Sequence, residues 1–341
     1  MAHATPLQSP GAADATAFVS HDVGFSAVLG DSARLSLVVS TDAHEGPVYF
    51  PDEDALYFTT VPVTANVPIL GMPLVKMKRI ALDGVRFPLE PDRVSTVLAD
   101  ANAANGMTLD RQGRLVACEQ GTRSQRAAIT ALDRANGERR TLADEWRGLP
   151  LNSPNDVVVR SDGSIWFTDP SYGHLQGFRP EPALGDYVYR LDPRSGRLSV
   201  VADSFDKPNG LAFSPDETVL YVGDSGANQE PDSYHPARPH HIKAFDVIDG
   251  RRLANERLLS VTNPGFPDGI KVDAVGRVYA SSFSGVQVFE PEGELIGEIS
   301  VPGAVNFTFG GPDRNVLYIT ADEAVWAAEL NVTSPSRLRG V

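Results

Sequence analysis

Six residues with oxygen-bearing side chains recur along the chain, each at the start of a short segment in which apolar and polar residues alternate. They are Glu45, Asn105, Asn155, Asn209, Asp268 and Asn306, at intervals of 60, 50, 54, 59 and 38 residues. Carboxylate and amide oxygens are the ligands of hard cations, and Ca²⁺ takes six to eight of them. Two carboxylates crowded together without a cation would be costly. If the six residues meet, the pattern predicts a divalent-cation site; a hydrogen-bonded plug around waters is the alternative.

The segments that begin at these residues share one pattern, which predicts a β-hairpin. The segment "NDVVVRSDGSIWFTD" from Asn155 has two apolar alternations around a turn that contains Asp and Gly. Stretches between the segments, such as "HIKAFDVIDGRRLANERLL", supply further strands, about four per repeat. Repeats of about 40 to 60 residues with four strands are typical of propeller blades. We expect an all-β fold with little helix: a six-bladed β-propeller with four-stranded antiparallel blades around a central axis.

The propeller fold would bring the six residues together, because the first strand of each blade runs beside the axis. Four of the six are followed by glycine, namely Gly46, Gly106, Gly210 and Gly269, which would let backbones approach closely there. We expect one propeller domain over 21–341 after a flexible N-terminal segment, 1–20. The segment "ARLSLVVST", about 33–41, is expected to pair with the last blade, since an exposed sheet edge would otherwise remain.

Composition excludes several classes of protein. Acidic residues outnumber basic ones by 44 to 30, for a net charge of −14, which argues against nucleic acid or an anionic membrane as partner. The single cysteine, Cys118, excludes an internal disulfide and a cysteine metal cage, and is expected in the core. The first residues lack the pattern of a signal peptide, and no apolar run is long enough to cross a membrane. We expect a cytoplasmic protein, either a monomer or a small homo-oligomer.

Long segments follow several hairpins and would rim the mouth that the six residues mark. Loops of this length in a compact domain are generally functional or disordered. Their candidate contacts to a polyhydroxy acid or its ring carbonyl are Arg123, Tyr172, His174, Tyr234 and His235, and exposed side chains without a role are the alternative. The apolar Met72–Leu74 stretch could cover one flank, which would favour a less sugar-like substrate.

Four motifs resemble the senescence marker protein/gluconolactonase/luciferin-regenerating enzyme family, most closely its gluconolactonase-like branch. They are "HEGPVYF", "LNSPNDVVVRSDGSIWFTDPSYG", "KPNGLAFSPDETVLYVGDSG" and "FPDGIKVDAVGRVY", and the likeness covers about 40–330. The resemblance implies a six-bladed propeller with one divalent metal at the axial mouth, and hydrolysis of a small-molecule lactone. Ca²⁺ is the first candidate for the metal; Zn²⁺, Mn²⁺, Mg²⁺ and Fe²⁺ are alternatives.

The resemblance also implies roles for individual residues. The metal ligands would be Glu45 of "EGP", Asn155 of "SPND", Asn209 of "PNG" and Asp268 of "PDG". A substrate contact is implied for Asn105 of "ANGMTLD". We place Asn306 with the substrate contacts as well, although "NFTFGGPD" resembles the family's last-blade motif less closely.

Such a site would hydrolyse a lactone by polarising the ring carbonyl and stabilising the oxyanion that forms when water attacks. Of the two carboxylates, Asp268 is the preferred base and Glu45 a ligand, with metal-bound hydroxide as the open alternative. The side chain of Asp156 should point to the opposite face and brace the neighbouring ligand, unless it makes a plain turn or inter-blade hydrogen bond. For His44 we expect a structural role.

Signatures of other hydrolases are missing from the sequence. It contains no G-x-S-x-G elbow, no H-E-x-x-H and no Walker loop. Two alternatives to a lactonase remain. One is a metal-dependent hydrolase of phosphotriester or phosphorus–fluorine bonds, and the other is a non-catalytic propeller that binds partners and holds a structural cation.

Overall fold

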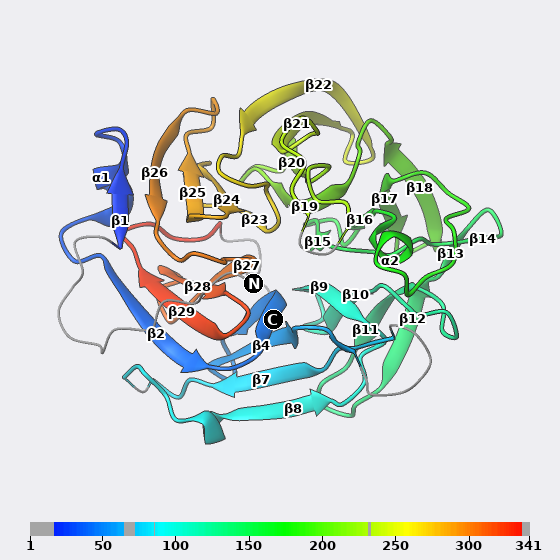
Figure 1. Ribbon diagram of the computed structural model, residues 1–341, viewed down its shortest axis with the longest axis horizontal. Coiled ribbons are helices and arrows are strands. Elements are labelled where there is room, and N and C mark those ends of the chain that lie inside the picture. Colours follow the sequence, from blue (N-terminus) through cyan, green and yellow to red (C-terminus); the bar gives the residue numbers. More distant parts are fainter. Residues whose placement is uncertain (1–16, 65–71, 85, 231–232, 336–341) are drawn as a thin grey trace.

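Six antiparallel sheets, five of four strands and one of five, surround a central axis in the computed structural model (Figure 1), which describes residues 17–64, 72–84, 86–230 and 233–335. The first three blades are β3 (Ala43–Phe50), β4 (Ala55–Thr60), β7 (Met77–Ala81) and β8 (Val94–Leu98); β9 (Ala104–Leu109), β10 (Leu115–Glu119), β11 (Ala128–Leu132) and β12 (Arg139–Ala143); and β15 (Val157–Val159), β16 (Ile165–Asp169), β17 (Tyr187–Asp192) and β18 (Arg197–Ala202).

The other three blades continue around the ring. They are β19 (Pro208–Phe213), β20 (Val219–Asp224), β21 (His241–Ile248) and β22 (Arg252–Val261); β23 (Ile270–Val272), β24 (Val278–Ser282), β25 (Gly285–Phe289) and β26 (Leu295–Ile299); and β27 (Asn306–Gly310), β28 (Val316–Thr320) and β29 (Ala324–Glu329) with β2 (Arg34–Ser40). The predicted six-bladed all-β propeller is therefore confirmed.

The last blade takes its outer strand from the N-terminal part of the chain. Strand β2 pairs antiparallel with β29, with Leu35 opposite Ala328 and Ser40 opposite Ala324. Strands from both ends of the domain thus share one sheet, and β2 covers the edge that β29 would otherwise expose.

The residues just before β2 are also ordered. Strand β1 (Phe18–Ser20) pairs with β26 and so adds a fifth strand to the blade of β23–β26. In the short helix α1 (Phe25–Leu29), Phe25 and Val28 are completely buried. Phe18, within the segment expected to be flexible, packs against the apolar cluster that contains Phe25. Ordered structure therefore begins before residue 20; the residues before 17 lie outside the described part of the chain.

The remaining elements are small. They are the hairpins β5 (Val63–Thr64) with β6 (Pro73–Leu74) and β13 (Glu145–Trp146) with β14 (Leu149–Pro150), the 3₁₀ turn η1 (Pro91–Arg93) and the helix α2 (Tyr172–Leu175). Within the described ranges, no helix has the length and apolarity needed to cross a membrane.

The core consists of apolar layers between neighbouring blades. In one layer Cys118 and Ile129 of the second blade pack against Phe167 and Tyr189 of the third. Both faces of an inner strand are therefore buried, as in β4, where all six residues are buried. Each fully buried side chain of this kind stabilises the fold by about 1.5–3 kcal/mol, and this packing fixes the inner strands around the axis.

Candidate functional site

Backbone irregularities place the six oxygen-bearing residues, which we call the axial cluster: Glu45, Asn105, Asn155, Asn209, Asp268 and Asn306. In three blades the pairing of the first two strands shifts at the cluster residue and its glycine. Leu211 pairs with Val222 but Pro208 pairs with Asp224, so Asn209 and Gly210 form a bulge, and the same shift surrounds Asn105–Gly106. Glu45 pairs with Thr59 and has a register shift on each side of it. Bulges of this kind re-aim side chains, here at the end of an inner strand.

The glycines join neighbouring blades around the axis. The Gly106 amide donates to the carbonyl oxygen of Asn155 at 2.7 Å, and the Gly210 amide donates to that of Asp268 at 2.9 Å. A Cβ atom on Gly210 would lie 2.0 Å from the Asp268 carbonyl oxygen, and one on Gly106 would lie 2.6 Å from that of Asn155. Only glycine permits this approach, so the sequence pattern of polar residue plus glycine has a steric cause.

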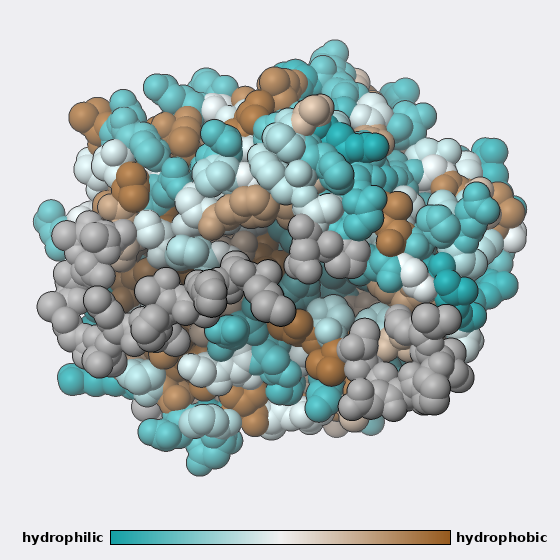
Figure 2. Space-filling view, viewed as in Figure 1, coloured by the Kyte–Doolittle hydropathy of each residue, from teal (hydrophilic) through white to brown (hydrophobic). Residues whose placement is uncertain are grey.

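Five members of the axial cluster line one pocket of about 170 Å³ at the mouth of the axis: Glu45, Asn105, Asn155, Asn209 and Asp268. The sixth, Asn306, is buried beside them, and its Nδ2 donates to Glu45 Oε2 at 2.8 Å. Seen along the same axis in Figure 2, this mostly hydrophilic face of the molecule is recessed near its centre. The structure thus brings all six residues together.

Burial sets the electrostatics of this pocket. It raises the pKa of Glu45, and the nearby carboxylates of Asp268 and Asp156 raise it further. Burial also raises the pKa of Asp268, although a hydrogen bond from Asn209 opposes this effect. Glu45 and Asp268 also share a hydrogen bond, which lowers the pKa of Asp268, while the charges of Asp156 and Asp322 raise it. An added cation would favour the charged form of both acids.

The pocket also contains amide oxygens without partners. Among the described residues, the Oδ1 atoms of Asn105 and Asn155 are buried and have no hydrogen-bond partner. No group of three or more His, Cys, Asp and Glu side chains in the described ranges has the arrangement of a metal site. The donors here are a mixed set of two carboxylates and several amides, which fits an oxygen-preferring cation such as Ca²⁺. Glu45, Asn155, Asn209 and Asp268 are the residues that could hold it.

Asp156 lies beneath the pocket, next to Gly106. Its Oδ1 accepts a hydrogen bond from the Val157 amide at 2.8 Å, while its Oδ2, also buried, has no partner in the described part of the chain. It adds a third carboxylate close to Glu45 and Asp268.

Of the five rim residues predicted to contact substrate, Tyr172 lines the pocket and the other four do not. The Tyr172 hydroxyl donates to the Ser225 carbonyl at 3.3 Å, and burial raises its pKa well above the ordinary value. Arg123 instead donates to the Gly177 carbonyl, His174 is exposed, and His235 faces Glu230 at 3.2 Å. The ring of Tyr234 packs against those of His240 and Phe283.

His44 also lines the pocket. Its Nδ1 lies 2.7 Å from Asp322 Oδ1. Burial by itself would lower the pKa of His44, but the hydrogen bond and the charges of Asp322 and Glu45 raise it above the ordinary value. Its position next to Glu45 is the sequence feature that could have indicated its place in the pocket.

Further lining residues come from loops and were not singled out in the sequence. Gln120, Phe178 and Asn228 belong to this group, and Pro73 of the apolar stretch lines the wall as well. Phe178 is fixed by its neighbour: the guanidinium of buried Arg179 donates to the carbonyls of Thr122, Gln125, Leu151 and Asn152. The pocket therefore combines a polar floor with a partly apolar wall.

Fold and site together define the class of protein: a six-bladed β-propeller that gathers carboxylates and amides from all its blades at one end of the axis. The model of the SMP-30/gluconolactonase/LRE-like region matches residues 43–323. The chain belongs to this family.

The comparisons with individual proteins agree with that assignment. The chain is 31% identical to the gluconolactonase of Zymomonas mobilis over 88% of its own length and 82% of the relative's. It is 34% identical to the crystal structure of a gluconolactonase from Xanthomonas campestris, with a TM-score of 0.75 and coverage of 96% and 99%. The calcium-binding protein regucalcin from Agrobacterium tumefaciens, at 16% identity, shares the fold with a TM-score of 0.63 over 86% of this chain and 92% of its own.

Proposed function

We propose that the chain is a lactonase that opens the ring ester of a sugar-type lactone at the axial cluster, with a divalent cation as cofactor. One observation carries the proposal: two buried carboxylates and the unpartnered amide oxygens of Asn105 and Asn155 converge on the floor of a small pocket. The family membership and the gluconolactonase relatives support the same reaction.

Glu45, Asn155, Asn209 and Asp268 would hold the cation. When bound, it would supply Lewis-acid polarisation of the lactone carbonyl. Glu45 is prepared as a ligand because Asn306 Nδ2 and the Gly46 amide both donate to its Oε2, at 2.8 and 2.9 Å.

Asp268 is the residue that we assign as base. It lines the pocket and shares a hydrogen bond with Glu45, whose Oε2 already accepts hydrogen bonds from Asn306 and Gly46, so Asp268 is the carboxylate left to act as general base. In this assignment a carboxylate oxygen of Asp268 removes the proton from the attacking water. Asn209 holds that carboxylate by a hydrogen bond.

Asn105 and Tyr172 complete the polar surface of the pocket and would orient the hydroxyl groups of the substrate. Pro62, Pro73, Val75 and Phe178 form its apolar part and would face the carbon skeleton of the ring. A pocket of about 170 Å³ suits a single small ring rather than a polymer.

The test is a substrate panel measured with and without chelator: a six-membered aldonolactone, a five-membered one and an aryl phosphotriester. We expect lactone hydrolysis that is lost with the chelator and restored by Ca²⁺ or another divalent ion. Glu45→Gln should lower kcat/KM at least about a hundredfold, whereas Glu292→Gln, at an exposed turn, should not.

Three outcomes would contradict the proposal. Activity that persists in chelator would remove the cation from the reaction. Faster turnover of the phosphotriester than of either lactone would reassign the substrate class. Cation binding without turnover of any substrate would favour a non-catalytic propeller.

A further inference from the structure

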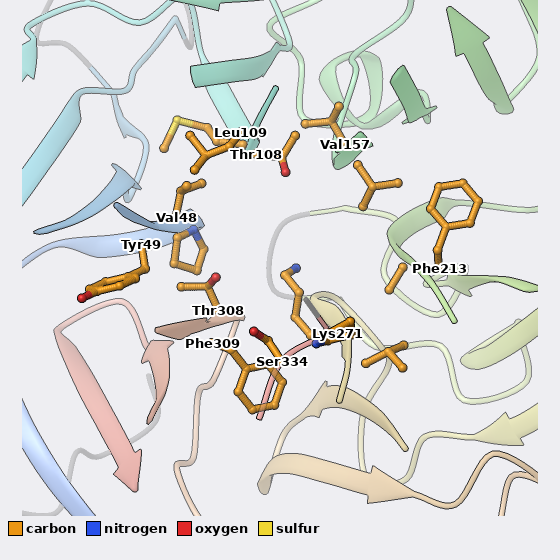
Figure 3. Close-up of a pocket in the computed structure, with 16 residues that line it drawn as sticks. Val48, Tyr49, Thr108, Leu109, Val157, Phe213, Lys271, Thr308, Phe309 and Ser334 are labelled. Atoms are coloured by element: carbon orange, nitrogen blue, oxygen red, sulfur yellow. The ribbon is translucent and has the colours of Figure 1, made fainter. Parts of the chain in front are cut away.

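A second cavity opens at the other end of the axis, and it contains a charged side chain that the proposed reaction does not use. Its volume is about 230 Å³, and its walls come from the first strands of all six blades (Figure 3). Most lining residues are apolar, such as Val48, Leu109 and Phe309. Lys271 of β23 is the one charged residue among those described as lining it.

Lys271 connects this cavity to the axial cluster. Figure 3 shows its side chain extending toward the centre of the ring. Its Nζ donates to Asn306 Oδ1 at 3.2 Å and to the Ile270 carbonyl at 3.1 Å. Asn306 in turn donates from Nδ2 to Glu45 Oε2 at 2.8 Å. The ammonium group is therefore two hydrogen bonds away from a proposed ligand.

Lys271 also acts through space on the acids around the axis. Burial raises the pKa of Asp156, and the charge of Lys271 is the main effect that opposes it. No carboxylate of the described residues lies within the 4.0 Å of an ion pair with this ammonium group. Lys271 is thus not ion-paired with an acid, and Asp156, whose carboxylate lies near Glu45 and Asp268, is the acid on which its charge acts.

The charges of the carboxylates, of Lys271 and of a bound cation can be compared. Three carboxylates carry three negative charges, Lys271 contributes one positive charge, and a divalent cation contributes two. Loss of Lys271 would therefore make this region more negative by one charge, with or without the cation. This difference matters most when an additional negative charge develops on the lactone carbonyl oxygen, since a less negative surrounding opposes that charge less.

We propose that Lys271 is a positioning and charge-balancing residue for the axial cluster: it orients Asn306, and through it Glu45, and it offsets the third carboxylate of the region. The inference rests on the proposed function. Because the developing charge exists only in the transition state, loss of Lys271 should lower kcat more than it changes KM.

The experiment compares wild type with Lys271→Met, which removes the charge, and Lys271→Arg, which keeps it. Lys243→Met is the matched control, because Lys243 is similarly sheltered but pairs with Glu256 on an outer strand. The readouts are the melting temperature with and without Ca²⁺, and kcat and KM for an aldonolactone.

For Lys271→Met we expect a lower melting temperature in chelator, because three carboxylates then repel each other without compensation, and a larger increase on adding Ca²⁺ than in wild type. We expect kcat to fall at least about tenfold and KM to change by less than about threefold. Lys271→Arg should stay within about threefold of wild type in both constants. Lys243→Met should leave the Ca²⁺ response and kcat unchanged.

The opposite pattern would overturn the inference. If Lys271→Met and Lys271→Arg both lose stability that Ca²⁺ does not restore, the side chain only fills space. If Lys271→Met keeps the wild-type kcat and Ca²⁺ response, its charge is irrelevant, while an active wild type leaves the lactonase proposal standing. A wild type with neither Ca²⁺ response nor lactone turnover would overturn both.

Discussion

At the scale of single residues, the floor of the pocket is defined by polar atoms that the protein leaves unsatisfied. A buried polar group without a partner costs about 1–3 kcal/mol, so such groups in a pocket indicate a ligand that completes them. Asn105 and Asn155 both meet this description through their Oδ1 atoms in the described part of the chain. Of the two, Asn155 is a proposed cation ligand, so its loss should weaken cation binding without affecting folding.

Asn155→Ala should weaken the binding of Ca²⁺ at least about tenfold, because one of four proposed oxygen ligands is removed. The stability of the chelated protein should change little, because the lost oxygen makes no hydrogen bond within the described protein. Isothermal titration of Ca²⁺ and thermal melting in chelator measure the two effects.

Asn102→Ala is the control for this prediction. Asn102 is also buried with an unpartnered Oδ1, but its Nδ2 donates to Glu119 Oε2 and to the Arg126 carbonyl, and it does not line the pocket. This variant should lose stability and keep its affinity for Ca²⁺. Equal effects of both variants on Ca²⁺ affinity would contradict the ligand role of Asn155.

The sequence allowed the axial cluster to be predicted, because the blades repeat and equivalent positions repeat with them. It did not indicate Lys271, which lies two residues beyond Gly269, because nothing in its spacing distinguishes it from an ordinary strand lysine. Its position at the axis follows from the closure of all six blades, and its partner Asn306 belongs to another blade. Roles that depend on such contacts require the tertiary structure.

At the scale of elements, the bulges beside Glu45, Asn105 and Asn209 are as important as the residues themselves. In the blade of β19 and β20, the bulge brings Gly210 against the backbone of Asp268. The side chain of Asn209 can reach the axis only while this contact is kept.

Gly210→Ala should therefore destabilise the fold by at least about 2 kcal/mol, because its Cβ would overlap the Asp268 carbonyl and push two blades apart. It should also reduce Ca²⁺ binding, since Asn209 and Asp268 would both move. Urea unfolding and Ca²⁺ titration are the measurements.

Gly223→Ala is a matched control in the neighbouring strand β20. Its Cβ would meet its nearest neighbour, the Pro267 carbonyl, at 3.1 Å, which small shifts can relieve. We expect a clearly smaller loss of stability and unchanged Ca²⁺ binding. If the two variants behaved alike, the close approach at Gly210 would not be what holds the cluster together.

The hairpins were predictable because apolar alternation and turn residues are local signals. The direction of loop side chains was not. Arg123 and His235 were reasonable candidates by residue type. However, Arg123 donates to the Gly177 carbonyl, and His235 faces the carboxylate of Glu230. Arg179 sits in the same kind of loop and turns inward instead, where four carbonyls accept its donors. The inward direction of Arg179 and the outward direction of Arg123 and His235 therefore depend on where their partner atoms lie in the folded chain.

At the scale of the whole molecule, the ring concentrates charge that the fold must tolerate. The two pocket acids have pKa values raised above those of free carboxylates, by burial first and then, for Glu45, by its neighbours. The folded chelated protein thus binds protons more tightly than the unfolded chain. By linkage, this contribution to stability is present at acidic pH and is lost as the pH rises through the raised pKa values.

We therefore expect the gain in melting temperature on adding Ca²⁺ to grow between about pH 5 and about pH 8, because the cation replaces the protons that the acids lose. The double variant Glu45→Gln, Asp268→Asn should show neither the pH dependence nor the gain. A gain that is constant over this range in wild type would mean that the two acids are not the groups involved.

The central claim is that oxygen-bearing side chains from separate blades hold one divalent cation at the end of the axis. The most direct measurement is the amount of Ca²⁺ bound per chain at equilibrium after complete removal of metal by chelation. The account predicts one tightly bound ion per wild-type chain and none in Glu45→Gln. A wild-type chain that binds no divalent cation, or a Glu45→Gln variant that binds it equally well, would contradict the account.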